Sequence, residues 1–290
     1  MKSKIRYRIS FYWKILKNAL LRFIKEDTFT QSAALAYYMV FSLPPMLLII
    51  FWTVGLWYKE AIVREAVFDE FGVLIGQDGA KQLMTTIEGL SSSKPTWGAA
   101  IIGMVTLLFM ISTVFVTIKQ ELNRIFEVEV NKSLKQGIWM MLLDRFLSIA
   151  MLSVFGLILT LSMVVSAIIT SFSEMIKDWI GDYTEWLMFI NSVAVNLIVL
   201  TLLFALTYRY MPDSRLKWSD TWFGAFFTAI LFVAGKALIA FFIANSQAAN
   251  FYEAAGSILV LMLWVFYTSA IFYFGANVTY SRAKILEENK

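Results

Sequence analysis

The sequence predicts an all-α fold: a polytopic membrane protein with six transmembrane helices, an N-terminal amphipathic helix at the membrane interface and short helices in the first outer loop. Three observations predict it. First, 59% of the 290 residues are hydrophobic and only 16% are charged, whereas a soluble domain carries about 25% charged residues. Second, charge-free runs recur that are long enough for a spanning helix of roughly 20 residues. Third, Lys and Arg alternate in number between successive connections, as expected of a chain that crosses a membrane repeatedly.

The six predicted spans form one transmembrane domain over residues 28–281, between a cytoplasmic N-terminal segment, 1–27, and a cytoplasmic tail, 282–290. Nineteen of the 25 Lys and Arg residues fall in the two termini and the even-numbered connections, and five fall in the odd-numbered ones. Because cytoplasmic loops are enriched in Lys and Arg, we expect both termini in the cytoplasm. The spans cover about 28–58, 95–118, 140–171, 186–208, 220–244 and 254–281.

The N-terminal segment carries apolar side chains at helical spacing, with Lys14, Lys17 and Lys25 on other faces. Such a helix lies on the membrane surface, where its basic residues are attracted to the anionic inner leaflet. Membrane lipids are therefore its expected partners, and the helix is either a plain interfacial anchor or a lipid sensor. The apolar positions are Ile5, Ile9, Tyr12, Trp13, Leu16, Leu20, Phe23 and Ile24.

The first outer connection, residues 59–94, is too long for a tight turn. It holds two short amphipathic patterns, over 62–67 and 83–90, separated by a break around Gly72–Gly79. We expect paired helices here that cap the outer face.

Pro44 and Pro45 stand side by side within the first span, in the stretch SAALAYYMVFSLPPMLLIIFW. Proline removes a helical hydrogen bond and clashes with the carbonyl four residues back, so the pair predicts a helix break between half-helices at 28–43 and 46–58. One interpretation is a kink held by packing against neighbouring helices. The other is a break that lines a polar cavity. The side chains available for hydrogen bonds are Ser32, Tyr37, Tyr38 and Ser42.

Lys236 is a cation inside the fifth span, in FVAGKALIAFF. A charge at mid-membrane costs at least about 2.5–3.5 kcal/mol. Helical side chains lean towards the helix N-terminus, which takes this lysine deeper and away from the nearer outer surface. Lys236 is therefore either a snorkelling residue or a buried functional one that binds an anionic headgroup or pairs with Glu253. Glu253 opens the sixth span on the outer side, and its alternative role is that of an exposed surface carboxylate.

The composition excludes several kinds of catalytic site. The chain has no Cys and no His, so it lacks thiolate ligands and the commonest metal ligand and general base. The sequence motifs of phosphate-binding loops, serine hydrolases and zinc proteases are absent, and the cytoplasmic carboxylates are scattered over different segments. We therefore expect no cofactor, no metal and no catalytic residue. Nucleic acid is not an expected partner, because the basic residues cluster beside hydrophobic runs, and the oligomeric state is left open.

Several segments resemble the YihY/virulence factor BrkB family of bacterial inner-membrane proteins. The segment AALAYYMVFSLPPMLL is similar to a family signature at Ala33, Ala34, Tyr37, Tyr38, Ser42, Leu43 and Pro45. ELNRIFEV matches at Leu122, Asn123 and Arg124, and YRYMPD and WFGAFF match at Arg209, Pro212, Trp222, Gly224 and Ala225. The last span matches best, at Tyr252, Gly256, Trp264, Tyr267, Gly275 and Ala276.

This resemblance implies six transmembrane helices in a bacterial inner membrane. The family carries an older ribonuclease label, which the composition does not support. It has also been linked to envelope integrity, resistance to host killing and lipopolysaccharide precursor export, which points to the handling of envelope lipids. Asn277 stands where the family usually has glutamate, and this departure counts against a proton- or cation-binding role there. Otherwise, asparagines in spans are by default polar contacts between helices.

Three functions remain open on the sequence. The first is a transporter or flippase-like protein for an anionic or amphipathic envelope molecule such as a lipid. The second is a non-catalytic scaffold for envelope machinery, and the third is a membrane-bound hydrolase or ribonuclease. For the first, Pro44 and Pro45 would permit bending. The candidate substrate-binding or gating residues are Lys236, Glu253, Tyr252, Arg124, Arg209, Asn277, Tyr37, Tyr38 and Ser42.

Overall fold

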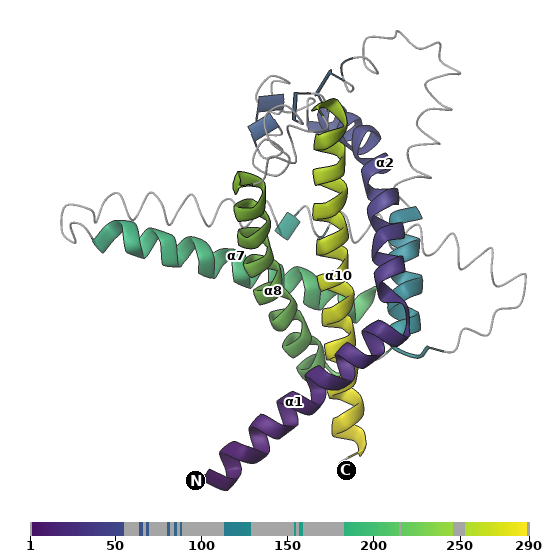
Figure 1. The fold of residues 1–290 in the computed structure, drawn as a ribbon, viewed down its shortest axis with the longest axis vertical. Helices are drawn as coiled ribbons and strands as arrows, with labels where there is room; N and C mark the ends of the chain where they lie inside the picture. Colours follow the sequence, from purple (N-terminus) through teal and green to yellow (C-terminus); the bar gives the residue numbers. More distant parts are fainter. Residues whose placement is uncertain are drawn as a thin grey trace, which may run out of the picture. The chain divides into compact units, whose positions relative to one another are not determined.

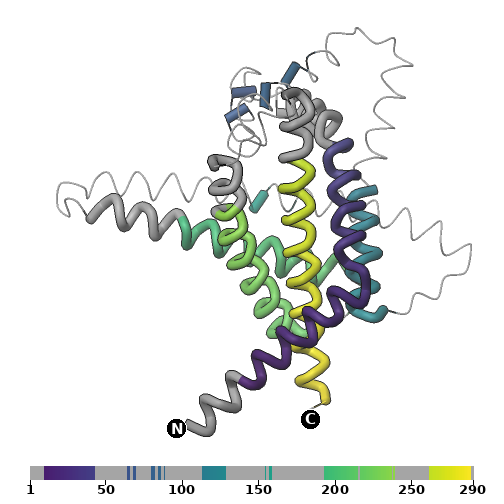
Figure 2. Tube along the Cα trace, viewed as in Figure 1, coloured from purple at the N-terminus to yellow at the C-terminus, as the bar shows by residue number. Residues whose placement is uncertain are grey.

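The structure, a computed structural model, describes residues 2–54, 113–128, 183–214, 216–245 and 253–288, with isolated residues between 64 and 88 and between 154 and 158 (Figures 1 and 2). In these helices, side chains are described at residues 10–42, 113–128, 193–214, 216–236, 238 and 261–288.

Every regular element in the described ranges is helical, which confirms the all-α prediction for them. The helices are α1 (Lys2–Lys25), α2 (Thr28–Val54), α7 (Tyr183–Tyr210), α8 (Trp218–Asn245) and α10 (Glu253–Glu288), together with a helical segment at residues 113–125 (Figure 1). Four of them match the predicted spans within a few residues at most ends. The spans at 140–171 and most of 95–118 lie outside the described residues, so the count of six stays a prediction.

Two helical stretches of the described part are long and apolar enough to cross a membrane. They are Val193–Tyr210, with a mean hydropathy of 1.7, and Leu261–Glu288, with a mean hydropathy of 1.4. Their lengths of 18 and 28 residues correspond to about 27 and 42 Å at 1.5 Å per residue. Both fall in helices that the sequence predicts as spans.

α2 runs through Pro44 and Pro45 as one helix from Thr28 to Val54. The structure thus describes a continuous helix in place of the expected half-helices. Proline removes only its own N–H from the hydrogen-bond ladder, and the carbonyls freed here are those of Val40 and Phe41. Next to them, the Ser42 hydroxyl donates to the Met39 carbonyl at 2.9 Å. The role of the prolines as a bending point stays a prediction.

The chain divides into two compact units, and α8 and α10 contribute to both. The first unit comprises residues 1–26, 119–233 and 271–290, and the second comprises 27–118 and 234–270. In the first unit, α1 buries Ile15 and Ala19 against Val278 and Ile285 of α10. In the second unit, Ala36 of α2 packs against Leu261 and Val265, and Arg64 forms an ion pair with Glu88 at 3.1 Å. The paired outer helices expected around that ion pair lie mostly outside the described residues.

In the first unit, α8 and α10 cross through a reciprocal pair of Gly-xxx-Thr motifs. A Cβ atom added to Gly224 would lie 1.7 Å from Thr279 Oγ1, and one added to Gly275 would lie 1.7 Å from Thr228 Oγ1. Each threonine hydroxyl also donates to the carbonyl of the glycine four residues earlier on its own helix, at 2.7 Å in α8 and 2.9 Å in α10. Small residues let membrane helices approach closely, so these glycines set the spacing of the two helices.

Tyr208 fixes α7 to the same crossing. Its buried hydroxyl donates to the Phe272 carbonyl of α10 at 2.6 Å and lies 3.0 Å from Thr228 Oγ1 of α8. Three helices thus meet at one hydrogen-bonded point. This contact fixes the position of α10, whose polar side chains are described below.

We predict that Gly275→Ala lowers the free energy of unfolding by about 1–3 kcal/mol, the usual cost of overpacking, because the new methyl group overlaps both Thr228 and Tyr208. Gly235→Ala is the matched control. Its Cβ would meet the ring end of Tyr267, which can shift more easily than a helix-bound threonine. Thermal unfolding in detergent micelles measures both, and equal losses of stability would contradict the assigned role of the crossing.

Candidate functional site

Two arginines join the C-terminal ends of α1 and of the helical segment 113–125. Arg22 of α1 donates to the Ile125 carbonyl at 2.8 Å. Arg124 donates in return to the Glu26 carbonyl, just beyond the end of α1. Free carbonyls at a helix C-terminus carry partial negative charge and favour cations. Each helix therefore supplies the cation that caps the other, and the two ends are held together.

Glu127 lies at the centre of this region, in a turn of unusual backbone conformation. Its φ of 53° is in the left-handed region, where glycine is usual. Val128 N–H bonds to the Asn123 carbonyl at 2.9 Å and Glu127 N–H to the Arg124 carbonyl at 3.1 Å, the pattern of a Schellman cap. A non-glycine residue at this position is strained, so other contacts must hold it.

The Glu127 carboxylate supplies those contacts. It accepts hydrogen bonds from Arg22 at 2.5 Å and from the Tyr280 hydroxyl at 2.7 Å, and it pairs with Lys284 at 3.3 Å. The hydrogen bond from Arg22, followed by that from Tyr280, lowers the Glu127 pKa to about 2. The carboxylate therefore stays ionised at neutral pH and ties α10 to the joined helix ends. We call Arg22, Arg124, Glu127, Tyr280 and Lys284 the tail network.

Asn123 and Asp213 exchange two hydrogen bonds. The Asn123 amide donates to the Asp213 carboxylate at 2.8 Å, and Asp213 N–H donates to Asn123 Oδ1 at 2.8 Å. Lys119 also pairs with Asp213 at 2.8 Å. The segments ELNRIFEV and YRYMPD, which lie far apart in the sequence, are thus in direct contact.

Glu121 is a carboxylate that is almost entirely buried, with 4% of the residue exposed. It pairs with Arg124 at 2.8 Å. Burial raises its pKa to about 7, against the opposing charge of Arg124. Because this value lies near physiological pH, Glu121 is poised to titrate there.

A row of polar side chains lies on one face of α10, one turn apart. Tyr273 and Asn277 are fully buried and Ser281 is 3% exposed. Among the described residues, no hydrogen-bond partner meets the Tyr273 hydroxyl, Asn277 Oδ1 or Ser281 Oγ. An unsatisfied buried polar group costs about 1–3 kcal/mol, so such atoms are usually met by ordered water or a ligand. We call these three residues the α10 polar row.

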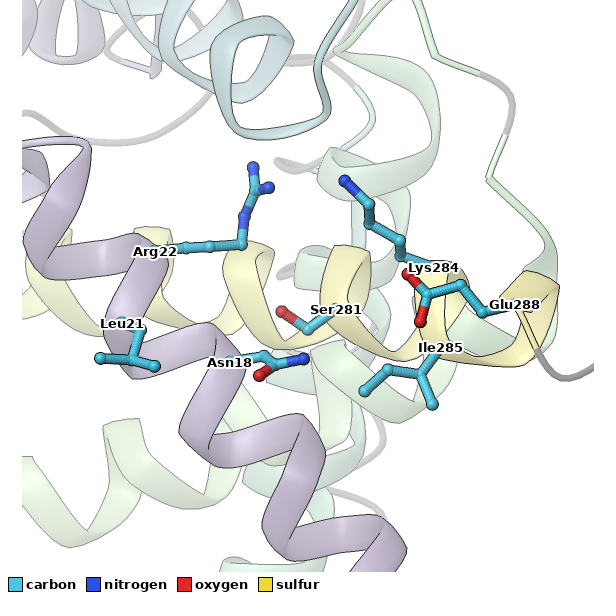
Figure 3. A pocket seen from close by; sticks show the side chains of 7 residues that line it. All are labelled: Asn18, Leu21, Arg22, Ser281, Lys284, Ile285 and Glu288. Carbon is cyan, nitrogen blue, oxygen red and sulfur yellow. The ribbon is translucent and has the colours of Figure 1, made fainter.

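A pocket of about 230 Å³ lies at the cytoplasmic end predicted for α10, between α10 and α1 (Figure 3). Ser281 belongs to both the α10 polar row and the pocket wall. The pocket is larger than the roughly 30 Å³ that one water occupies. Its lining residues are Asn18, Leu21, Arg22, Ser281, Lys284, Ile285 and Glu288.

The structure places three of the predicted site residues in this first unit, with different neighbours. Arg124 belongs to the tail network, and Asn277 belongs to the α10 polar row, where its amide donates to the Tyr273 carbonyl at 3.0 Å. Arg209 lies apart from them: it donates to the Leu216 carbonyl and stacks 5.7 Å over Trp218.

The other predicted residues belong to the second unit. Ser32 and Ser42 donate to carbonyls of α2 itself, and Tyr37 and Tyr38 are exposed. Lys236 is exposed on α8. Tyr252 and the side chain of Glu253 lie outside the described residues, so the Lys236–Glu253 pair stays a prediction.

Sequence reasoning missed Arg22, Glu127, Ser281 and Lys284 as members of one site. Arg22 and Lys284 counted only towards topology, and nothing in the sequence linked them across more than 250 residues. One usable signal existed: Tyr273, Asn277 and Ser281 recur every four residues, which places them on one helical face.

We predict that the free energy of unfolding falls as pH rises from about 4.5 to about 7, because of Glu121. Its pKa is raised from 4.5 to about 7, so in this window the folded state keeps a proton that the unfolded state has released. Glu121→Gln should flatten most of the slope of melting temperature against pH. Glu26, whose pKa burial also raises, would leave a smaller residual slope.

Glu127→Gln is the control for this measurement. The Glu127 pKa of about 2 lies below the window, so this variant should melt at a lower temperature with an unchanged slope. An unchanged slope in Glu121→Gln would mean that Glu121 does not titrate there.

Comparison with known proteins assigns the chain to a protein family. Its residues 19–290 match the family described as virulence factor BrkB. A ribonuclease-like protein, YfkH, of Bacillus subtilis is 25% identical over 284 residues, 94% of this chain and 98% of that protein. A UPF0761 membrane protein of Alteromonas mediterranea is 25% identical, with 92% of this chain and 87% of that protein covered. A UPF0761 membrane protein of Alcanivorax borkumensis is also 25% identical, with 89% of this chain and 58% of that protein covered.

No solved structure matches the chain. The family match covers nearly its whole length, and these two UPF0761 relatives are named as membrane proteins. The helices predicted from hydropathy and the family match therefore lead to one assignment: this chain is a membrane protein of the BrkB virulence factor family.

Proposed function

We propose that the chain is a multi-pass protein of the bacterial cytoplasmic membrane that binds an anionic or amphipathic envelope molecule, such as a lipid, and moves it between leaflets. Both termini lie in the cytoplasm in this proposal, in line with the 19-to-five division of basic residues. The tail network would form the fixed cytoplasmic end, and the α10 polar row would face the substrate path.

The α10 polar row carries this proposal. A protein that only holds helices together gains nothing from three buried polar atoms without partners, since each costs about 1–3 kcal/mol. A protein that admits water or a headgroup needs such atoms, because they bind the guest when it arrives. Tyr273, Asn277 and Ser281 lie at one-turn intervals on α10, so they offer successive contacts along one helix face.

Lys236, Pro44 and Pro45 enter the proposal as additional parts. Lys236 would attract the anionic headgroup within the membrane, where pairing with that negative charge would offset the several kcal/mol that an intramembrane cation costs. The two prolines would let α2 bend between states. Arg209 would meet headgroups on the cytoplasmic side beside Trp218.

The scaffold function is less well supported by these contacts. It calls for a bundle in which every buried polar group is satisfied, whereas the three atoms of the α10 polar row and Arg22 Nε of the tail network meet no hydrogen-bond partner among the described residues. A metal-dependent hydrolase without His or Cys would require three or more converging carboxylates. The described residues contain no group of three or more acidic residues arranged to hold a metal ion.

We predict that Asn277→Leu slows headgroup translocation roughly tenfold, equivalent to about 1.4 kcal/mol of barrier. The substitution nearly conserves volume but removes one member of the α10 polar row. Its melting temperature should stay equal or rise, because an unsatisfied buried acceptor is lost. The measurement uses labelled lipid in vesicles reconstituted with the full chain.

Asn196→Leu is the matched control, because Asn196 is an exposed asparagine of α7. It should transport at the wild-type rate. Vesicles with wild-type protein that translocate no faster than empty ones would end the transport proposal, and a wild-type rate in Asn277→Leu would separate the α10 polar row from transport.

We also predict that Lys236→Ala lowers the rate for an anionic lipid more than for a zwitterionic one, since the loss of the ammonium group removes attraction to net negative charge. Lys217→Ala, which removes an exposed lysine just before α8, controls for overall charge. Equal rates for Lys236→Ala and wild type with both lipids would remove Lys236 from the mechanism.

A further inference from the structure

We propose that the pocket between α1 and α10 binds the phosphate group of a membrane lipid headgroup. The inference rests on the proposed function and names its substrate class. The pocket is about 230 Å³, below the roughly 300–1,000 Å³ of sites that enclose a whole drug-sized ligand. It therefore suits a headgroup whose acyl chains remain outside.

Two hydrogen-bond donors at the pocket lack partners among the described residues. They are Ser281 Oγ and Arg22 Nε, both of them buried atoms. In Figure 3, Ser281 lies between Arg22 of α1 and Lys284 of α10, with the Asn18 amide next to it. A phosphate offers several acceptor oxygens and binds best where donors are charged or desolvated, which is the combination found here.

Lys284 is the cation of the pocket that can turn to a ligand. Its Nζ lies 3.3 and 3.4 Å from the two Glu127 oxygens, longer than the roughly 2.7–2.9 Å of a strong charged hydrogen bond. Its side chain is 48% exposed. Arg22, by contrast, binds Glu127 at 2.5 Å and Glu26 at 2.8 Å. A phosphate bound to Lys284 would therefore leave Glu127 held by Arg22 and Tyr280.

The apolar surroundings favour a lipid over a free phosphate ion. Leu21 and Ile285 line the pocket beside its polar groups. On the same helix as Leu21, Trp13, Leu20 and Ile24 are each more than half exposed, which is the apolar face expected to lie in the membrane interface. A headgroup in the pocket would thus have its acyl chains next to lipid.

Glu288 weakens the binding of an anionic ligand in this pocket. Its carboxylate lines the same pocket and repels a phosphate at close range. Removing this charge should therefore strengthen phosphate binding, the opposite of the effect expected for Lys284. Opposite signs from two residues of one helix would be hard to produce by general loss of folding.

The test is calorimetric titration of the purified full chain in detergent with dioctanoyl phosphatidic acid. Lys284→Ala should weaken binding about tenfold, as for a charged hydrogen bond, and Ser281→Ala about fivefold. Glu288→Gln should tighten binding about threefold. Ser281→Ala should not lower the melting temperature, because it removes an unsatisfied buried hydroxyl.

Three comparisons make the test decisive. Lys14→Ala, an exposed lysine of α1 outside the pocket, should bind like wild type. Dioctanoylglycerol, which lacks phosphate, should not bind, and inorganic phosphate should bind far more weakly than the lipid. Equal binding of lipid and inorganic phosphate, equal binding of dioctanoylglycerol, or equal losses in Lys14→Ala and Lys284→Ala would each overturn the proposal.

The outcome is separable from that of the proposed function. Binding with the expected pattern but no translocation in vesicles would leave a lipid site on a protein that does not transport. Translocation that depends on Asn277 without phosphatidic acid binding would keep transport and remove this pocket from it.

Discussion

The exchange of caps between Arg22 and Arg124 is the interaction on which the rest of the first unit depends. Each guanidinium satisfies carbonyls at the end of the other's helix, so neither α1 nor the segment 113–125 can shift without exposing both ends. The turn that follows is strained at Glu127. Its carboxylate then extends the fixed point to α10 through Tyr280 and Lys284. Electrostatic contacts between helix ends thus add to the apolar packing of Ile15 and Ala19 of α1 against α10.

In the middle of α10, buried polar atoms are left without hydrogen-bond partners in the part of the chain that the structure describes. Gly275 leaves no room for even a Cβ atom beside Thr228, yet the Tyr273 hydroxyl and Asn277 Oδ1, on a neighbouring part of the same helix, meet no hydrogen-bond partner among the described residues. A bundle under selection for stability alone would replace such atoms with apolar ones, because that change is neutral or stabilising. Their presence beside this close crossing therefore supports the proposed ligand, and the crossing would hold the row in place while that ligand binds.

Hydropathy and charge predicted the helices well. A helix buried in lipid must be long and apolar, and both properties can be read from a single sequence. α7 and α8 begin and end within a few residues of the predicted spans. A helix break was expected at Pro44 and Pro45 because proline removes a hydrogen bond and clashes with the carbonyl four residues back. α2 nevertheless continues through both, since a helix within a membrane protein can accommodate that local loss without ending. The tail network was not predictable, because it joins Arg22, Glu127 and Lys284 through folding rather than spacing. The α10 polar row had the right period but carried no sign of lacking partners.

Ser281 is the last member of the α10 polar row and also forms part of the wall of the pocket beside α1. A headgroup that entered at the membrane interface would meet the two cations of the pocket, Lys284 and Arg22, together with Ser281. Further along α10 the available contacts are neutral, at Asn277 and Tyr273. Strong electrostatic capture followed by weaker neutral contacts is what passage requires, because a site that binds too tightly inside the membrane would hold its ligand rather than release it.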